Sequence, residues 1–255
     1  MGITTKKSGS PTGRDGQSGQ VEVETAVILP MVVFLLLGLI QLGLLHQARI
    51  FAKYGSYRAV RTGSLHNGDV EKMEMAALAS VLPIVSRAKG GAEVLGRTDN
   101  ATNWVKKWMR PGFGMGLKNR MVDFPSLPYT EVTICGPAKG DVSGAVYNDT
   151  AAFDMIATSS EGVNTKLRIR LVLYYRMIIP FANWMIHRMW RGEKIVEELH
   201  LDARDVVIPN ASIDAKVIAA AKQGIFIIPI ETHYSMKMHS DIPLANFPET
   251  ANECH

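Results

Sequence analysis

The uncharged run from Ala26 to Leu45 is the feature that most constrains what this chain can fold into. Its twenty residues include only four that are not strongly apolar, namely Pro30, Gly38, Gln41 and Gly43. A helix of this length rises roughly 30 Å, which matches the hydrocarbon core of a bilayer. We therefore predict a membrane-spanning helix over residues 26–45.

A cleaved secretory signal is the main alternative, because a basic leader with Lys6, Lys7 and Arg14 precedes the run. Such signals have an apolar core of roughly 7–15 residues followed by an A-x-A-like cleavage site. Here the run is longer and no such site follows it. We therefore favour an uncleaved helix.

Beyond the run, the sequence contains no proline until after the turn residues Asn67 and Gly68. We expect the helix to continue as a stalk, so that an N-terminal helix covers residues 20–66.

The composition gives no sign of a catalytic or nucleic-acid-binding protein. The 28 basic and 24 acidic residues are scattered rather than gathered into one basic face. None of the seven histidines lies in a metal-binding motif, and neither a nucleophile elbow nor a phosphate-binding loop occurs. We expect no enzyme activity, no cofactor, no metal and no nucleic acid. The two cysteines, Cys135 and Cys254, either form one disulfide or remain unrelated thiols.

The remaining residues, 67–255, predict an outer domain of short helices and strands. Apolar and polar residues alternate over 167–177 and over 230–238, as in strands of one sheet with one buried face. Further strands are expected at 130–135 and 194–209. Helices are expected from about Asp69, over 102–109 and over 211–224, with Gly224 just past the last one. The predicted fold class is α+β, with the long N-terminal helix as spine and an antiparallel sheet.

An amphipathic segment at 181–192 has two interpretations. It could lie on lipid headgroups with Trp184 and Trp190 at the interface, or it could pack on the sheet. A second membrane span through it is disfavoured by Arg176, His187 and Arg188.

Two acids, Glu22 and Glu24, stand just before the apolar run. Glu24 is the fifth residue after Gly19, and the run opens almost directly after it. A glycine followed at the fifth place by glutamate, and then by an unbroken apolar helix, is the pattern of a type IV prepilin. Together with "GQVEVETAVILPMVVFLLLGLIQLG" and "ARIFAKYGSYRAVRTG", this segment resembles the TadE-like pseudopilins of tight-adherence (Flp) pilus systems. It departs from that family at Glu22, at Thr25 and in the length of its leader.

The resemblance implies a processed envelope protein. A prepilin peptidase would cut after Gly19, removing the leader of residues 1–19 and leaving Gln20 as the N-terminus. Glu24 would then compensate an N-terminal amine during assembly, because a carboxylate at the mouth of a membrane helix needs a partner. The implied location is the bacterial inner membrane, single-pass, with residues 67–255 in the periplasm or carried into an extracellular pilus. Charge counting alone favours the opposite orientation.

The implied partners are the prepilin peptidase, other pilins or pseudopilins, the inner-membrane assembly platform and the lipid bilayer. The implied function is that of a minor pilin or pseudopilin, a structural component of a pilus or related secretion system. The alternative from the residues themselves is an unprocessed, single-pass, membrane-anchored binding protein.

Overall fold

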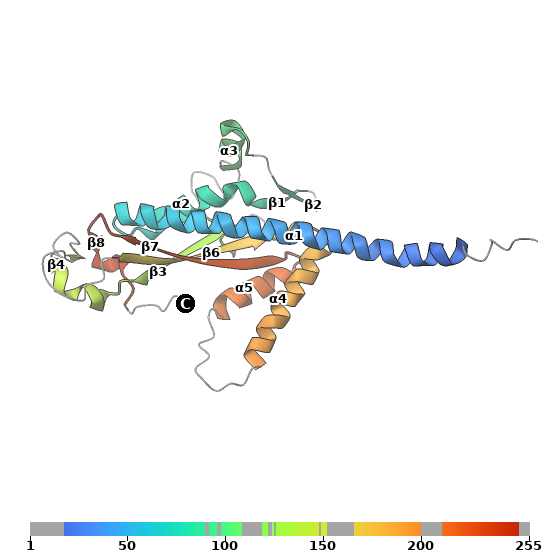
Figure 1. The fold of residues 1–255 in the computed structure, drawn as a ribbon. Coiled ribbons are helices and arrows are strands. Elements are labelled where there is room, and N and C mark those ends of the chain that lie inside the picture. The colour runs from blue at the N-terminus through green and yellow to red at the C-terminus, as the bar shows by residue number, and fades with distance from the viewer. Residues whose placement is uncertain are drawn as a thin grey trace, which may run out of the picture. The chain divides into compact units, whose positions relative to one another are not determined.

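The computed structural model describes residues 18–89, 92–95, 98–108, 119–121, 124, 126–147, 149–151, 166–199 and 211–249. The chain divides into two compact units, Met1–Ile40 and Gln41–His255, and each is described by itself. The long helix α1 (Ser18–Leu65) contributes residues to both units (Figure 1).

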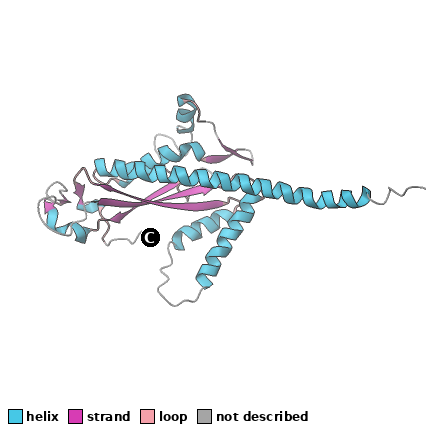
Figure 2. Cartoon of the chain, viewed as in Figure 1, coloured by secondary structure: helices cyan, strands magenta, loops and turns pink. Residues whose placement is uncertain are grey.

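The other elements belong to the second unit, where helices and an antiparallel sheet occur together (Figure 2). The helices are α2 (Val70–Val81), α3 (Ala101–Trp108), α4 (Ala182–Leu199) and α5 (Ala211–Lys222), with short 3-10 turns η1 (Leu82–Ile84), η2 (Lys139–Ala145) and η4 (Leu244–Asn246). The strands are β1 (Ser86–Lys89), β2 (Ala92–Leu95), β3 (Thr130–Gly136), β4 (Val146–Tyr147), β5 (Thr150–Ala151), β6 (Lys166–Arg176), β7 (Ile227–Lys237) and β8 (Ile242–Pro243). The predicted α+β class with a helical spine is confirmed.

The main sheet has the order β3-β6-β7, and both pairings are antiparallel. Leu171, in the central strand, lies opposite Val132 on one side and Thr232 on the other. The strands expected at 130–135, 167–177 and 230–238 are therefore confirmed as one sheet. Two smaller sheets accompany it, a β1-β2 hairpin and a β4-β5-β8 sheet.

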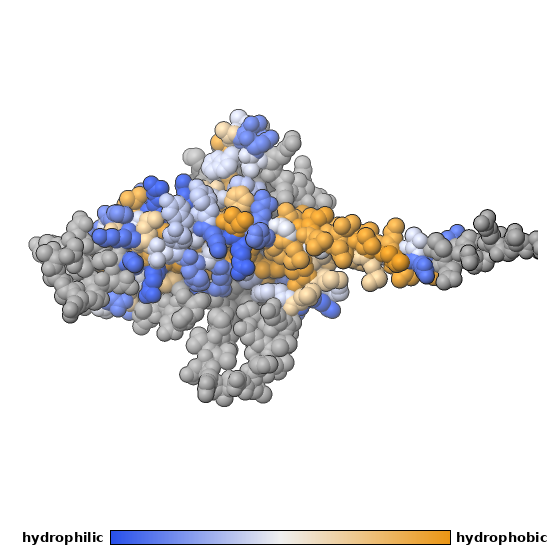
Figure 3. All heavy atoms as spheres, in the orientation of Figure 1, coloured by the Kyte–Doolittle hydropathy of each residue, from blue (hydrophilic) through white to orange (hydrophobic). Residues whose placement is uncertain are grey.

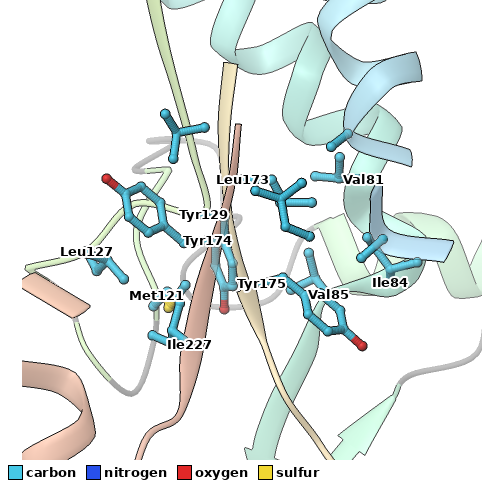
Figure 4. Close-up of a cluster of buried hydrophobic side chains, with 14 of the residues drawn as sticks. Val81, Ile84, Val85, Met121, Leu127, Tyr129, Leu173, Tyr174, Tyr175 and Ile227 are labelled. Atoms are coloured by element: carbon cyan, nitrogen blue, oxygen red, sulfur yellow. The ribbon is translucent and has the colours of Figure 1, made fainter. Parts of the chain in front are cut away.

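The central strand is buried on both faces in its second half, where the sequence predicted one buried face. Leu173 points toward Val81 of α2, whereas Tyr129 and Leu127 lie on the other side of the strands (Figure 4). Val172 and Tyr174 are fully buried on that second side, in a core that also contains Val217 and Ala220 of α5. The expectation fails there because the segment before β3, together with α5, covers what an isolated sheet would expose.

Local turn chemistry ends the helices where the sequence indicates. Asn67 and Gly68 take φ values of 60° and 68° directly after α1, a conformation that asparagine and glycine tolerate best. Asp69 then caps α2 by accepting the backbone N–H groups of Glu71 and Lys72 at 3.1 and 3.4 Å. Gly224, at φ 77°, follows α5 as a left-handed cap.

The strand expected over 194–209 is wrong for its first part, because residues 194–199 belong to α4. Lys194, Glu197, Glu198 and Leu199 are good helix formers. Extending an existing helix through them also needs no new nucleus, which is the costly step in helix formation. Residues 200–209 lie outside the described part of the chain.

Candidate functional site

The residues expected at the processing and assembly site lie at the start of α1. The helix begins at Ser18, so Gly19 and Gln20 are in its first turn and Glu24 is in its second. The first turn contains no acidic residue. Because the influence of the helix dipole falls off after the first turn, the dipole stabilises the Glu24 carboxylate only weakly. The Glu22 and Glu24 side chains are both exposed.

The apolar part of α1 in the first unit is exposed around its circumference. Figure 3 shows it as a band of orange residues along the N-terminal part of α1. Its exposed large side chains are Val23, Val27, Ile28, Leu29, Met31, Val32, Val33, Phe34, Leu35, Leu36, Leu39 and Ile40. Among the described helices, one is long and apolar enough to cross a membrane, within Glu22–Leu65. A surface of this kind is costly in water and favours lipid or the apolar face of another helix.

From Ala48 onward, α1 presents small residues to the sheet. The buried positions recur at helical spacing and are Ala48, Ala52, Gly55, Ser56, Ala59, Val60, Gly63 and Ser64. A Cβ added at Gly55 would lie 3.3 Å from Leu171 Cδ2, and one added at Gly63 would overlap Met73 Sδ and lie 3.0 Å from Leu167 Cδ2. The absence of side chains at these two glycines is what allows α1 to approach the sheet so closely.

Polar contacts fix α1 to the strands along the same face. Thr232 Oγ1 donates to Ala52 O at 3.3 Å, and the rings of Tyr57 and Tyr234 meet edge to face with centroids 5.5 Å apart. At the end of the helix, Ser64 O accepts the backbone N–H of His239 at 3.1 Å. The outer half of α1 is thereby part of the folded domain rather than a free stalk.

The second unit meets the end of the apolar run at Gln41. This side chain is fully buried, and its Oε1 accepts the backbone N–H of Ile179 at 3.0 Å. Leu44 and Leu45 pack against the core one turn later. Protein contacts therefore begin to cover α1 inside the predicted span of residues 26–45, four residues before its end.

A partly buried polar group joins α2 to the edge strand β3. Glu74 accepts the N–H of Val132 and the side-chain amide of Asn119, each at 3.4 Å, and burial raises the pKa of the Glu74 carboxyl. Nearby, Tyr174 donates to Glu131 Oε2 at 2.9 Å, and burial together with the Glu131 charge raises the pKa of the Tyr174 phenol. These contacts are all internal to the domain, so we read the group as structural.

Other sequence expectations meet the structure only in part. Cys135 is buried in β3, and the described residues contain no free cysteine. Cys254 lies outside the described residues, so its pairing with Cys135 stays a prediction. Within the described residues, no group of three or more His, Cys, Asp and Glu side chains is placed to hold a metal ion.

Sequence reasoning missed two features of the domain. The small residues from Ala48 to Ser64 were a readable signal, because their spacing marks one face of a helix. The contact between Gln41 and Ile179 was not readable, because a side chain and a backbone group 138 residues apart leave no local pattern.

Comparisons with known proteins agree with the expectation for the N-terminal part. The family model described as TadE-like protein matches residues 19–61, which confirms the predicted resemblance. The search of curated proteins and the search of solved structures found no match. The match thus covers the apolar run and most of the helix that packs on the sheet.

Proposed function

Starting from residues 19–61 as a TadE-like segment, we propose that this protein is a membrane-anchored minor pilin or pseudopilin of a tight-adherence type IV pilus or a related secretion system. The observation that carries the proposal is the exposed apolar half of α1, preceded by Gly19 and Glu24. The role is structural assembly, and we propose no catalytic activity, cofactor or metal.

Processing would take place in the first turn of α1. The bond after Gly19 lies between the second and third residues of the helix. The first four N–H groups of a helix have no acceptor within it, so the end frays at little cost. A prepilin peptidase could thus open this turn without unfolding the remaining helix, and the product would begin at Gln20.

The new amine and Glu24 would then lie on the same side of the helix. Gln20 and Glu24 are four residues apart, which is the spacing of neighbours on a helix surface. A carboxylate within lipid costs a few kcal/mol, and pairing with an ammonium offsets this cost most strongly where the dielectric is low. The partner amine can belong to the same chain or to the next subunit of a bundle.

The all-round apolar surface suits both states of such a protein. Before assembly, lipid would solvate the side chains of residues 26–40, most of which are exposed in the structure. During assembly, the same side chains would pack against equivalent helices of other pilins or pseudopilins. The proposed location is the bacterial inner membrane, with the outer domain in the periplasm or carried into a pilus.

N-terminal sequencing of the mature protein tests processing. We expect a chain that begins at Gln20 in cells containing the prepilin peptidase, and the full-length chain in cells lacking it. Full-length protein in both strains contradicts the proposal.

Paired substitutions test the assembly role of the carboxylate. Glu24→Ala should leave membrane insertion unchanged and abolish incorporation into the assembled structure, measured by co-purification with the other pilus components. Glu22→Ala is the matched control, since it removes an exposed acid two residues away on a different side of the helix. Normal assembly of the Glu24 variant would remove the ion-pair mechanism.

An unprocessed, single-pass, membrane-anchored binding protein is the second candidate. Glu22 favours it, because this acid places an additional charge three residues after the expected cleavage point. Its signature is an intact N-terminus, at Met1 or Gly2, in cells that contain the peptidase.

A further inference from the structure

Helix α4 carries an exposed apolar stripe on one side. Phe181 stands directly before the helix, and Trp184, Met185 and Met189 share one face of it, with Met189 four residues after Met185. Their exposed fractions are 65%, 47%, 47% and 69%. Arg188 shares the stripe, with its guanidinium 4.8 Å from the centre of the Trp184 ring.

The opposite face of α4 is packed on the domain. Ala182 and His187 are buried, and Ile186 and Trp190 pack against the core. His187 also contacts the carbonyl of Ile227 at 3.3 Å. This packing holds the helix in place, so the exposed stripe has a fixed orientation on the second unit. The interpretation that the segment packs on the domain is therefore confirmed for this face, and Trp190, expected at the lipid interface in the other interpretation, packs against the core.

The start of α4 lies beside the end of the predicted span. The hydrogen bond from Ile179 N to Gln41 Oε1 places it next to α1, four residues before Leu45. Four residues of helix correspond to about 6 Å along its axis. A span that ends at Leu45 therefore places this hydrogen bond within about 6 Å of the boundary between acyl chains and headgroups.

The charge of the first half of α4 also fits a membrane surface. Between residues 177 and 192 the sequence contains Arg188 and Arg191 and no acidic residue, and both arginines are exposed. Tryptophan at the interface and basic residues beside anionic headgroups are the typical anchors of such helices.

We propose that the first half of α4 is a second membrane-contact site, distinct from the spanning helix. Phe181, Trp184, Met185 and Met189 insert into the interfacial layer of the bilayer, and Arg188 and Arg191 bind anionic lipid headgroups. The contact would set the orientation of the outer domain on the membrane. A protein partner would also cover an apolar stripe, but continuity with the spanning helix and the two arginines in the first half of α4 favour lipid.

Fluorescence quenching by brominated lipid tests this contact in the full-length protein. The protein is reconstituted into vesicles of equal parts phosphatidylcholine and phosphatidylglycerol, with bromine atoms near the headgroup end of the acyl chains. The signal of Trp184 is the difference between wild type and Trp184→Phe. We expect brominated lipid to reduce that signal about twofold. Trp104→Phe is the matched control, and its difference signal should be quenched less, because Trp104 is partly buried against the core.

A charge reversal tests the role of the arginines. Arg188→Glu combined with Arg191→Glu should restore most of the Trp184 signal in the brominated vesicles, whereas Lys237→Glu, at an exposed position on β7, should not. The proposal is overturned if the Trp184 signal is equal in brominated and unbrominated vesicles. It also fails if the two charge variants behave alike. Neither measurement depends on cleavage at Gly19 or on pilus assembly, so this proposal can fail while the proposed function stands.

Discussion

The two halves of α1 differ in the environment that each side chain requires. Residues 22–40, in the first unit, present large apolar side chains that remain exposed, whereas residues 48–64, in the second, present small ones that are buried against a sheet. A helix that is apolar around its circumference is suited to lipid or to other helices, and one with a narrow stripe of small residues is suited to one closely fitting surface. The size of the side chains thus distinguishes the two halves of one continuous helix: large exposed apolar residues in the first half, and small residues that pack on the sheet in the second.

The glycines of α1 show the same difference. A Cβ built at Gly38 or at Gly43 meets nothing within 4 Å, whereas Gly55 and Gly63 have close neighbours. Glycine in the first pair is therefore not required by any contact within the described residues. Glycine in the second pair is required by the approach of the helix to the sheet.

The largest expected effect comes from truncating a side chain beneath the packed half of α1. Leu171 is fully buried, and its Cδ2 lies against Gly55. Leu171→Ala should lower the free energy of unfolding of the outer domain by about 3 kcal/mol, through lost burial and the cavity left behind. This loss of stability is measured by urea unfolding in detergent, with circular dichroism as the signal. Leu36→Ala, in the exposed half, should leave that transition unchanged, and equal effects would contradict the division of α1.

A side chain added at the closest approach should have the next largest effect. Gly63→Leu should destabilise the outer domain by about 2 kcal/mol, because Met73 and Leu167 must move to make room. Gly43→Leu adds the same atoms where no neighbour lies within 4 Å, and should cost nothing measurable. The same unfolding experiment compares them. A Gly63 variant as stable as the wild type would show that α1 is not held against the sheet at this point.

Removing the side chain that caps the start of α2 should lower the stability of the outer domain by a smaller amount. Asp69 accepts two backbone N–H groups and contacts Lys72 Nζ at 3.0 Å, and these contacts lower the pKa of its carboxyl. Asp69→Ala should cost about 1 kcal/mol, and Asp69→Ser, which keeps an acceptor at the cap, should cost less. Thermal unfolding of the three proteins side by side distinguishes these outcomes. Equal stability of the alanine and serine variants would contradict a capping role.

The smallest expected effect is a change in pH dependence on the packed face of α4. Burial lowers the pKa of His187, with a further contribution from the charge of Arg191, so this imidazole binds a proton less readily in the folded state than in the unfolded chain. As pH falls below the ordinary histidine value, the unfolded chain binds the proton first, and stability decreases. His187→Gln should reduce this loss between about pH 6.5 and 5. His233→Gln, at an exposed position, is the control, and an identical profile for both variants would contradict the argument.

Much of this fold was readable from local signals. The apolar run, the turn at Asn67 and Gly68 and the alternation in β6 and β7 each predicted an element that the structure contains. The strand expected over 194–209 failed because a short mixed run suits either a strand or a helix, and the preceding helix decided between them. Burial of Val172 and Tyr174 was not readable, since it depends on segments distant in sequence.

For the candidate site, too, the sequence predicted some features and left others to the structure. Gly19 and Glu24 follow from a motif, and the family match covers them, but their roles are properties of partners that one chain does not contain. The stripe on α4 required the structure, because the sequence could not say which of its apolar residues pack on the domain.

The close fit at Gly63 has a mechanical consequence. A slide of α1 along the sheet by four residues, about 6 Å, would bring Ala59 into the place of Gly63, where its methyl group would overlap Met73. Met73 of α2 thereby opposes such a slide of α1. A force along the axis of α1 that is too weak to unfold the domain would therefore move the helix and the sheet together. The domain would be displaced with its helix as one rigid unit.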